Sequence, residues 1–340
     1  MASASARDVA LDPDWLPHTY DVGGANLTFV HVPPEERQQL MFLSDEHFAD
    51  KFQKIAFPMN AVEAELGTPA RAPLHFLFHT SFCCSTLLAR ALEIPGVSTA
   101  LREPDVFINL GNRLIRSDDQ ANRKRLELVL RLFERGARPG EAVIVKPSNF
   151  GNRLIDLILA QRPQSRAVLL YSDAGTYLRS LLKRGMFGRI FGRKLFNQIS
   201  AWSPVDFGFS AAELFEQTDL QIAALGWLMQ IHHFDAVARA FGPSRVMLLD
   251  SATLIADPQG SLSRVTALFG LGLDEQRIAE IVGGPAFSRH SKFSEREYGA
   301  DAREKDHEAV MAAHAEELGM VLQWIEAVAG QLGLPMKPGR

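Results

Sequence analysis

Cysteine is nearly absent from this chain, and the two cysteines that it contains are adjacent. Cys83 and Cys84 are the only cysteines among 340 residues. Neighbouring cysteines rarely close into a disulfide because the bridged geometry is strained. No CxxC pair is present for a zinc site. We therefore expect two reduced, small side chains in a tight loop rather than a redox pair.

Long hydrophobic runs and an excess of basic charge are also missing. No stretch approaches the length of a membrane span, about 20 apolar residues, and residues 1–15 lack the apolar run of a signal peptide. The net charge of −4 argues against a nucleic-acid groove. We expect a cytoplasmic protein that binds neither a membrane nor nucleic acid.

Spacings typical of metal ligands are absent as well. The sequence has no HExxH motif. His75 and His79 lie four apart on an expected strand, so they face the same way but stand about 13 Å apart, too far to share an ion. His232 and His233 fall in an expected helix, either as core residues or as the lining of a pocket. We expect no metal ion.

What the sequence does contain is a series of apolar runs that alternate with helical patterns. The runs are LHFLF, VSTAL, AVIV, AVLLY and VMLL, beginning at residues 74, 97, 142, 167 and 246. Continuous apolar strands separated by helices predict a parallel sheet covered on both faces. The length and the 46% hydrophobic content allow a large core. The predicted fold is a three-layer α/β/α sandwich with a central parallel sheet of about five strands.

Three regions are expected along the chain. Residues 1–70 form an N-terminal appendage with a hairpin that turns at Gly23 and Gly24. Residues 71–272 form the core. Residues 273–340 contain a basic loop and a final helix, from about residue 304 to 330, that packs back on the core.

The segment FLFHTSFCCSTLLARAL, residues 76–92, reads as a buried strand, a tight loop and a helix that begins at Ser85 and Thr86. The amides of such a loop and the N-terminus of such a helix bind phosphate or sulfate. Against the phosphate-loop pattern GxxxxGK[ST], only Thr86 matches, because Ser85 replaces the lysine on which ATP chemistry relies. The alternative is a plain strand-to-helix turn whose leucines pack on the sheet.

Four segments together resemble the sulfotransferase family, whose members bind 3'-phosphoadenosine 5'-phosphosulfate (PAPS) on a modified phosphate loop. They are HTSFCCST at 79–86, VIVKPSN at 143–149, LLYSDAGTYLRSL at 169–181 and VMLLDSATLIADPQGSLSRVTALFGL at 246–271. Their order along the chain matches that of the family. The resemblance implies a P-loop NTPase-like core and sulfuryl transfer without a metal.

The resemblance also implies the residues that hold the donor. These are the loop residues Ser81, Phe82, Cys83, Cys84, Ser85 and Thr86, the serines Ser172 and Ser180, and the late basic residues Arg289 and Lys292. The sequence departs from the family at three of them. Phe82 stands where the loop has a lysine, Cys84 where it has a glycine, and Ser172 where an arginine binds the 3'-phosphate. Another cation must then pair with that phosphate.

Lys146 and Glu103 are the expected catalytic residues. Lys146 ends an expected strand, as a family lysine does, and would supply positive charge to the leaving oxygen. Glu103 follows the second strand, and Pro104 forces it out of a helical conformation toward the site, where it would act as the base. The alternatives are a lysine that pairs with a nearby acid and a glutamate in a solvated turn.

Three functions remain open at this point. The first is a PAPS-dependent sulfotransferase acting on a hydroxyl or amine of a small-molecule acceptor. The second is a kinase that uses ATP and magnesium, with Asp250 as its metal-binding acid and the basic segment 183–194 as a lid. The third is a non-catalytic nucleotide-binding protein. Segment 183–194 is expected to be either a mobile flap over an anionic ligand or a solvated charge run. A homodimer is a further expectation for this chain.

Overall fold

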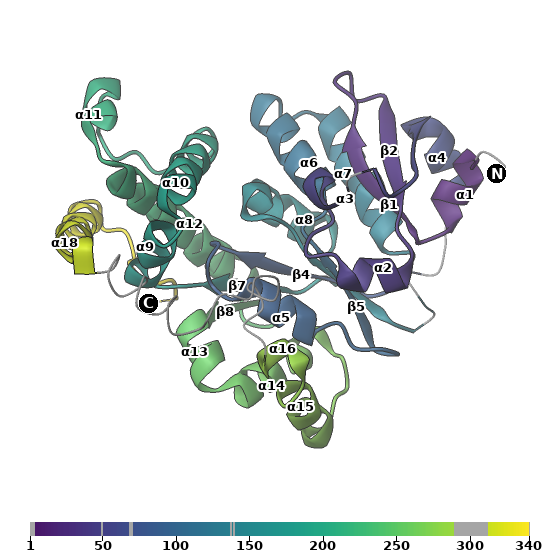
Figure 1. Cartoon of the computed structure of the whole chain (residues 1–340). Helices are drawn as coiled ribbons and strands as arrows, with labels where there is room; N and C mark the ends of the chain where they lie inside the picture. Colours follow the sequence, from purple (N-terminus) through teal and green to yellow (C-terminus); the bar gives the residue numbers. More distant parts are fainter. Residues whose placement is uncertain are drawn as a thin grey trace.

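A five-stranded parallel sheet lies at the centre of this computed structural model (Figure 1). The structure describes residues 4–48, 50–67, 71–136, 138, 140–288 and 312–339. The strand order is β5-β6-β4-β7-β8, and all neighbours run parallel. The strands are β4 (Leu74–His79), β5 (Ser98–Arg102), β6 (Ala142–Lys146), β7 (Ala167–Tyr171) and β8 (Val246–Asp250). The predicted parallel sheet of about five strands is confirmed.

Burial on both faces explains why these strands read as continuous apolar runs. Every residue of β4, β5, β6 and β7 is buried. Successive side chains point to opposite faces of a sheet. Phe76 and Phe78 therefore belong to one hydrophobic cluster, and Leu77 between them belongs to the other.

Helices cover both faces of this sheet and complete the predicted three layers. The Phe76 face is covered by α6 (Asp105–Arg116), α7 (Gln120–Phe133), α8 (Ile155–Gln161), α9 (Ala174–Leu182) and α12 (Asp219–Phe241). The Leu77 face is covered by α5 (Ser85–Ala91), α13 (Ser251–Ala256), α14 (Pro258–Phe269), α15 (Glu275–Val282) and α16 (Pro285–Ser288). A 3-10 helix, η1 (Asn149–Leu154), follows β6.

The N-terminal region forms a second, antiparallel sheet. Its strands are β1 (Trp15–Tyr20), β2 (Asn26–His31) and β3 (Lys54–Pro58), and its helices are α1 (Ala6–Leu11), α2 (Pro34–Gln39), α3 (Asp45–Phe48) and α4 (Met59–Leu66). The predicted hairpin at Gly23 and Gly24 is confirmed, and Gly24 adopts a positive φ of 73°. Residues of this sheet share one hydrophobic cluster with α6 and α7. The domain boundaries at residues 70 and 272 stay predictions.

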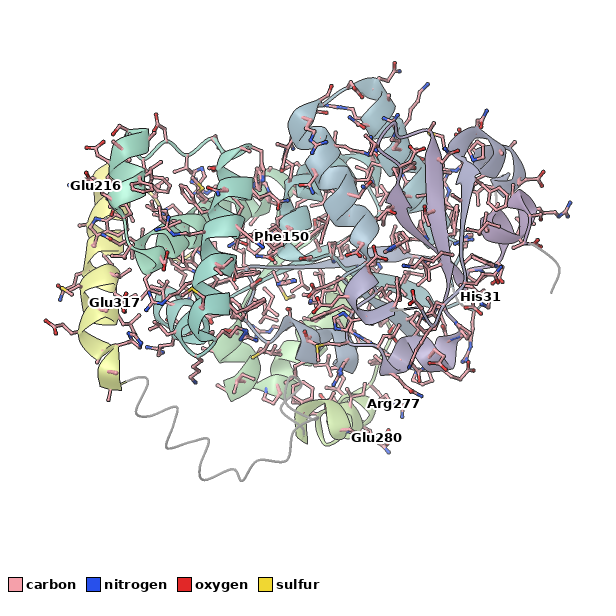
Figure 2. The ribbon with its side chains drawn as sticks, turned by 45° about the horizontal axis from the view of Figure 1, so that its top comes forward. His31, Phe150, Glu216, Arg277, Glu280 and Glu317 are labelled. Atoms are coloured by element: carbon pink, nitrogen blue, oxygen red, sulfur yellow. The ribbon has the colours of Figure 1, made fainter. Side chains whose placement is uncertain are left out.

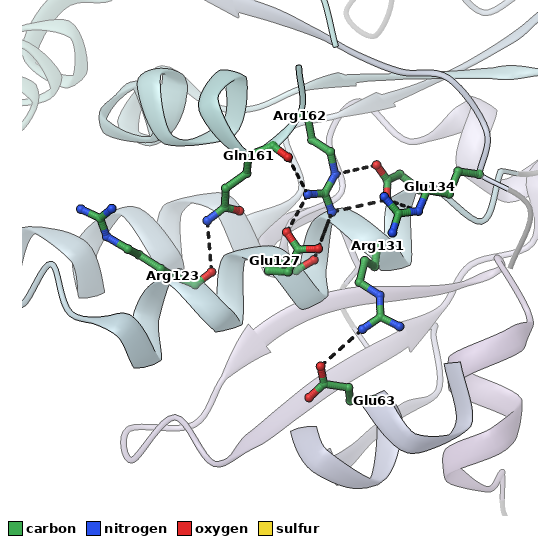
Figure 3. Close-up of polar contacts among 8 residues, drawn as sticks. Glu63, Arg123, Glu127, Arg131, Glu134, Gln161 and Arg162 are labelled. Atoms are coloured by element: carbon green, nitrogen blue, oxygen red, sulfur yellow. Dashed lines mark hydrogen bonds and ion pairs between the residues drawn. The ribbon is translucent and has the colours of Figure 1, made fainter. Parts of the chain in front are cut away.

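Arg162, just after α8, binds Glu127 of α7 and Glu134, the C-cap residue of that helix (Figure 3). Its Nε donates to Glu134 Oε1 at 2.6 Å, and its Nη1 donates to Glu127 Oε2 at 2.6 Å. In the same view, Arg131 of α7 binds Glu63 of α4 at 3.3 Å. These ion pairs connect α8 with α7, and α7 with α4 of the N-terminal region.

Helix α10 (Gly185–Ser200) packs on α9 and α12 through its glycines. A Cβ added at Gly188 would overlap the carbonyl oxygen of Leu181, and one at Gly192 would lie 2.7 Å from Ala223 Cβ. Residues 185–194 therefore belong to a packed helix, and the predicted flap is wrong about the structure of this segment.

Two further helices are α11 (Ala211–Glu216) and α18 (Ala315–Leu332). The capping box of Ser210 and Glu213 begins α11. The final helix was predicted from about residue 304 to 330; in the structure α18 begins at Ala315, and residues 304–311 lie outside the described part. No helix among the described residues has both the length and the apolar character needed to cross a membrane.

Candidate functional site

The loop between β4 and α5 has an unusual backbone. Ser81, Phe82 and Cys84 have positive φ angles of 72°, 52° and 63°. Residues other than glycine rarely adopt this conformation, which costs about 1–3 kcal/mol each and occurs often at functional sites. Consecutive amides in such conformations can form a concave anion-binding nest. The only other non-glycine residue with positive φ in the described chain is Glu103, at 52°.

The start of α5 offers hydrogen-bond groups that other described residues do not use. Cys84 is the N-cap residue, and its side chain does not cap the helix. Ser85 and Thr86 are both buried, and neither hydroxyl bonds to a described residue. The hydroxyl of Thr80 is also buried without a partner among the described residues. Such groups favour a bound anion at the position that the sequence predicts.

Hydrogen bonds to strand β7 hold this loop in place. The Thr80 amide and the Cys83 thiol donate to the carbonyl oxygen of Leu170, at 3.1 and 3.4 Å. The Ser81 amide donates to His79 Nδ1 at 3.1 Å. Both cysteines lie in this loop, as expected. Cys83 is fully buried, and its thiol has a structural contact with Leu170. The reduced state of the pair stays a prediction.

Phe82, at the position of the family's loop lysine, packs in an aromatic cluster. Its ring lies 5.4 Å from that of Phe191 and 5.9 Å from that of Tyr177. The guanidinium of Arg184 lies over the Phe82 ring, 4.5 Å from its centre. Burial lowers the pKa of Arg184, and its guanidinium forms no hydrogen bond or ion pair with a described residue. A cation of the basic segment 183–194, which the sequence marks as a candidate to bind the anionic ligand, thus lies next to the loop.

Glu103 and Lys146 are in direct contact at the ends of β5 and β6. The Lys146 ammonium forms an ion pair with Glu103 Oε1, and His79 Nε2 lies 3.8 Å from the same oxygen. Lys146 is 1% exposed and the Glu103 side chain is 18% exposed. The two expected catalytic residues are therefore brought together, next to His79 at the end of β4. This pairing is also what the alternative for Lys146 predicts.

The N-terminal region contributes to this site, which the sequence did not reveal. Lys146 Nζ lies 5.2 Å from the ring centre of Phe42. The Leu43 amide donates to the carbonyl oxygen of Arg102 at 2.7 Å, and the Asp105 amide donates to that of Leu43 at 3.3 Å. Segment 41–43 therefore lies against the end of β5 and covers one side of the buried ammonium.

Ser172 and Ser180 differ in their surroundings. Ser172, after β7, is fully buried, its carbonyl oxygen accepts from Trp227 Nε1 at 2.9 Å, and its hydroxyl has no partner among the described residues. The Ser180 hydroxyl donates to the carbonyl oxygen of Thr176 at 2.9 Å. Between them, Asp173 caps α9 by accepting from the Thr176 amide at 2.9 Å. A carboxylate thus occupies a helix start that would otherwise attract a phosphate.

The remaining donor residues lie outside the described part of the structure. Arg289 and Lys292 belong to residues 289–311, which are not described. Their role on a 3'-phosphate stays a prediction.

Buried amides form a second layer behind the loop. Asn152 of η1 donates to the carbonyl oxygen of His79 at 3.1 Å. Gln230 of α12 accepts from Asn149 at 3.3 Å and from Asn152 at 3.4 Å. All three side chains are buried. The end of β4 is thereby linked to the long helix α12, a contact that no motif of the sequence predicts.

A groove of about 520 Å³ opens between α6 and α10, with Phe150 among its lining residues. Phe150 lies near the middle of the molecule in Figure 2. Its ring is 5.7 Å from that of Phe191, which in turn contacts Phe82. Arg116 and Lys194 line the same groove.

The other histidines lie apart from this chemistry. His75 stacks on Phe269 with ring centres 5.0 Å apart, and burial lowers the pKa of His75 to about 4. His233 Nε2 lies 3.5 Å from Asp156. Among the described residues, His18, Asp45 and Asp105 could hold a metal ion. Lys54 already binds Asp45 at 2.5 Å, and Asp105 accepts the Asp45 amide at 2.8 Å, so this group is an ion-paired cluster.

Comparison with known proteins gives similarity at the level of structure. No protein-family model matches the chain, and no curated protein sequence matches it. The solved sulfotransferase domain of the curacin biosynthetic pathway is 11% identical, with 79% of this chain and 99% of that chain covered and a TM-score of 0.43. A Mycobacterium avium sulfotransferase is 13% identical, with 75% and 78% covered and a TM-score of 0.43.

A third similar structure is the sulfotransferase domain of a Synechococcus olefin synthase. It is 14% identical, with 65% of this chain and 80% of that chain covered and a TM-score of 0.41.

Proposed function

We propose that this protein is a sulfotransferase that moves a sulfuryl group from PAPS to a hydroxyl or amine of a small-molecule acceptor. One observation carries the proposal. The Glu103–Lys146 ion pair lies beside the strained loop between β4 and α5, and His79 contacts both. Sulfuryl transfer needs a group that binds the anion, a positive charge near the leaving oxygen and a base, and these groups would supply all three.

The phosphosulfate end of the donor fits the loop. The free amides at the start of α5 and the unused hydroxyls of Ser85 and Thr86 would hold its oxygens. Arg184, beside Phe82, would provide the charge that the family takes from a loop lysine. When bound, the donor supplies the activated sulfuryl group.

The 3'-phosphate end fits the described residues less well. Ser172 and Ser180 offer hydroxyls, but Asp173 places a carboxylate between them at the start of α9. Cations for this phosphate must therefore come from another segment, and Arg289 and Lys292 are the proposed residues.

Glu103 is proposed as the base. Lys146 engages its Oε1, so its other oxygen is the one that would accept the proton of an acceptor hydroxyl. Protonation would neutralise the carboxylate and leave the buried Lys146 ammonium without its counter-charge. That ammonium would then stabilise negative charge on the leaving oxygen.

The groove between α6 and α10 is the proposed position of the acceptor. Phe150 and Ile115 offer apolar surface, and Arg116 and Lys194 offer positive charge. This composition suits an acceptor with an aromatic or apolar body.

The kinase alternative requires a magnesium-binding acid, and Asp250 is engaged elsewhere. It accepts the Ala252 amide at 2.9 Å and pairs with Lys337 at 3.4 Å. These contacts argue against a metal site on Asp250.

Thermal unfolding with two nucleotides tests the proposal. The desulfonated product, 3'-phosphoadenosine 5'-phosphate, should raise the melting temperature without metal. A ligand present at one hundred times its dissociation constant adds about 2.7 kcal/mol of stability. Stabilisation by magnesium-ATP alone would instead favour the kinase, and stabilisation by neither nucleotide would contradict a nucleotide site.

A further inference from the structure

A second cavity, of about 640 Å³, lies beside α5 and away from the phosphate loop. Figure 1 shows α5 between α2 and α16, and residues of these three helices and of α15 line the cavity. Its volume lies within the usual range for small-molecule sites, about 300–1,000 Å³. None of its lining residues belongs to the loop or to the Glu103–Lys146 pair.

A buried guanidinium forms part of the cavity wall. Arg102 is 3% exposed. Its Nη2 donates to the carbonyl oxygens of Arg37, Gln38 and Leu40 at 3.0, 3.1 and 2.8 Å. Its Nη1 has no hydrogen bond with a described residue, although the residue lines the cavity. A buried charged group with a free donor is a built site for an anion.

A second guanidinium, that of Arg90, lines the same cavity. It is half-buried and forms no hydrogen bond or ion pair within the described residues. The pKa of Arg102 is lowered by burial and, to a smaller extent, by the like charge of Arg90. Both guanidinium groups line the same cavity, so an anion bound there would offset their like charges.

The charges of the wall define the anion. Glu93 offsets one of the two arginines, and its Oε2 accepts the Ala100 amide at 2.7 Å. Arg277 is matched by Glu280 at 2.8 Å, and Figure 2 shows this pair on α15. The cavity is lined by the three positive charges of Arg90, Arg102 and Arg277 and the two negative charges of Glu93 and Glu280. Its net charge is therefore +1, which suits a monoanion. A phosphate dianion would in addition face the Glu93 carboxylate.

The rest of the wall is apolar. It consists of Ala91, Ile94, Pro95, Ile281, Pro285 and Ala286. We propose that this cavity binds a small amphipathic carboxylate, with its carboxylate between Arg90 and Arg102 and its apolar body against these side chains.

Calorimetric titration of the full chain with octanoate tests this assignment. Octanoate should bind at least tenfold more tightly than acetate, which lacks the apolar body, and than 1-octanol, which lacks the charge. Arg90→Gln should weaken octanoate binding at least tenfold, whereas Arg7→Gln, at an exposed arginine of α1, removes the same charge and should leave it unchanged. Ala286→Trp should abolish binding by filling the cavity.

The octanoate affinity of Thr86→Ala shows whether octanoate binds in this cavity or in the phosphate loop. This substitution alters the phosphate loop and should leave octanoate affinity unchanged, whatever its effect on nucleotides. Absence of octanoate binding, equal affinity for acetate, or an affinity that Arg90→Gln leaves unchanged would each overturn the proposal. Loss of octanoate binding in Thr86→Ala would overturn it too, because the carboxylate would then lie in the loop.

Discussion

Glu103 and Lys146 are joined twice across neighbouring parallel strands. The Glu103 amide donates to the Lys146 carbonyl oxygen at 2.6 Å, and the two side chains form an ion pair. The first contact explains how Glu103 is held at a φ of 52°. The second places an acid and a cation at one point of the sheet edge, so their roles can be separated by substitution.

Glu103→Gln should preserve the shape of the site and its nucleotide affinity. Turnover should fall on the order of 10²-fold, because the amide cannot accept the acceptor's proton. The acidic limb of the pH–rate profile should disappear as well. Steady-state rates from pH 5 to 9 measure both effects. If instead His79→Asn removes the limb while Glu103→Gln keeps normal turnover, the base is His79.

Lys146→Ala should lower turnover at every pH and retain the acidic limb, because it removes positive charge and not the base. It should also destabilise the fold by about 3 kcal/mol, since a partly buried carboxylate loses its partner. Lys51→Ala, at an exposed lysine, is the control. A Lys146→Ala enzyme with normal turnover and reduced stability would make this lysine purely structural.

Thr86→Ala should weaken binding of 3'-phosphoadenosine 5'-phosphate about tenfold or more, because a hydroxyl that contacts an anion is lost. Cys83→Ala should lose the bond to Leu170 and about 1 kcal/mol of stability, while nucleotide affinity stays near that of the unaltered protein. Calorimetry and urea unfolding measure the two effects. If Cys83→Ala abolishes nucleotide binding while Thr86→Ala leaves it unchanged, the phosphate-loop interpretation is contradicted.

Arg184→Gln should weaken nucleotide binding about tenfold, because it removes the cation beside Phe82. The adjacent Lys183 is exposed, so Lys183→Gln is a control with the same loss of charge and should change affinity little. If both substitutions weaken nucleotide binding equally, Lys183 and Arg184 act only through their general positive charge, and Arg184 has no specific contact with the nucleotide.

His75 should make the fold sensitive to acid. Its pKa is about 4 in the folded protein because of burial, against about 6.5 for an unfolded chain. The folded state binds fewer protons than the unfolded state between these values, so the free energy of unfolding falls as pH falls. From pH 7.5 to 5.0 the loss should be about 2 kcal/mol.

His75→Phe keeps a ring against Phe269 and removes the titration. Urea unfolding at the two pH values should therefore show a smaller pH-dependent loss in this variant. An unchanged loss would assign the acid sensitivity to other groups.

Much of the fold was predictable because its signals are local. The strand ending at Tyr171 is apolar throughout and buried on both faces, and Gly24 marks the hairpin turn. The β3 strand was missed because its burial alternates with exposure over only five residues, a weak pattern beside proline. The glycines of segment 183–194 predict a flap from the sequence alone, whereas in the structure Gly188 and Gly192 allow close packing of helices.

The site was predictable in position and less so in its contacts. Strand ends meet at one edge of a parallel sheet, which located Glu103, Lys146 and the loop together. The approach of Phe42 to Lys146, and of Arg184 to Phe82, depends on how distant segments pack. The sequence marks Arg184 as part of a basic segment, but no spacing within the sequence encodes these two contacts, so the contacts are seen only in the folded chain.

Because Trp227 donates a hydrogen bond to the carbonyl oxygen of Ser172, its intrinsic fluorescence can report on nucleotide binding. Trp227 is fully buried on α12, and its indole touches the segment proposed to hold the donor nucleotide. Its fluorescence should respond when that segment shifts or when an anion changes the local field. The chain has four tryptophans, so the difference between the spectra of the unaltered protein and Trp227→Phe isolates this signal without any added dye.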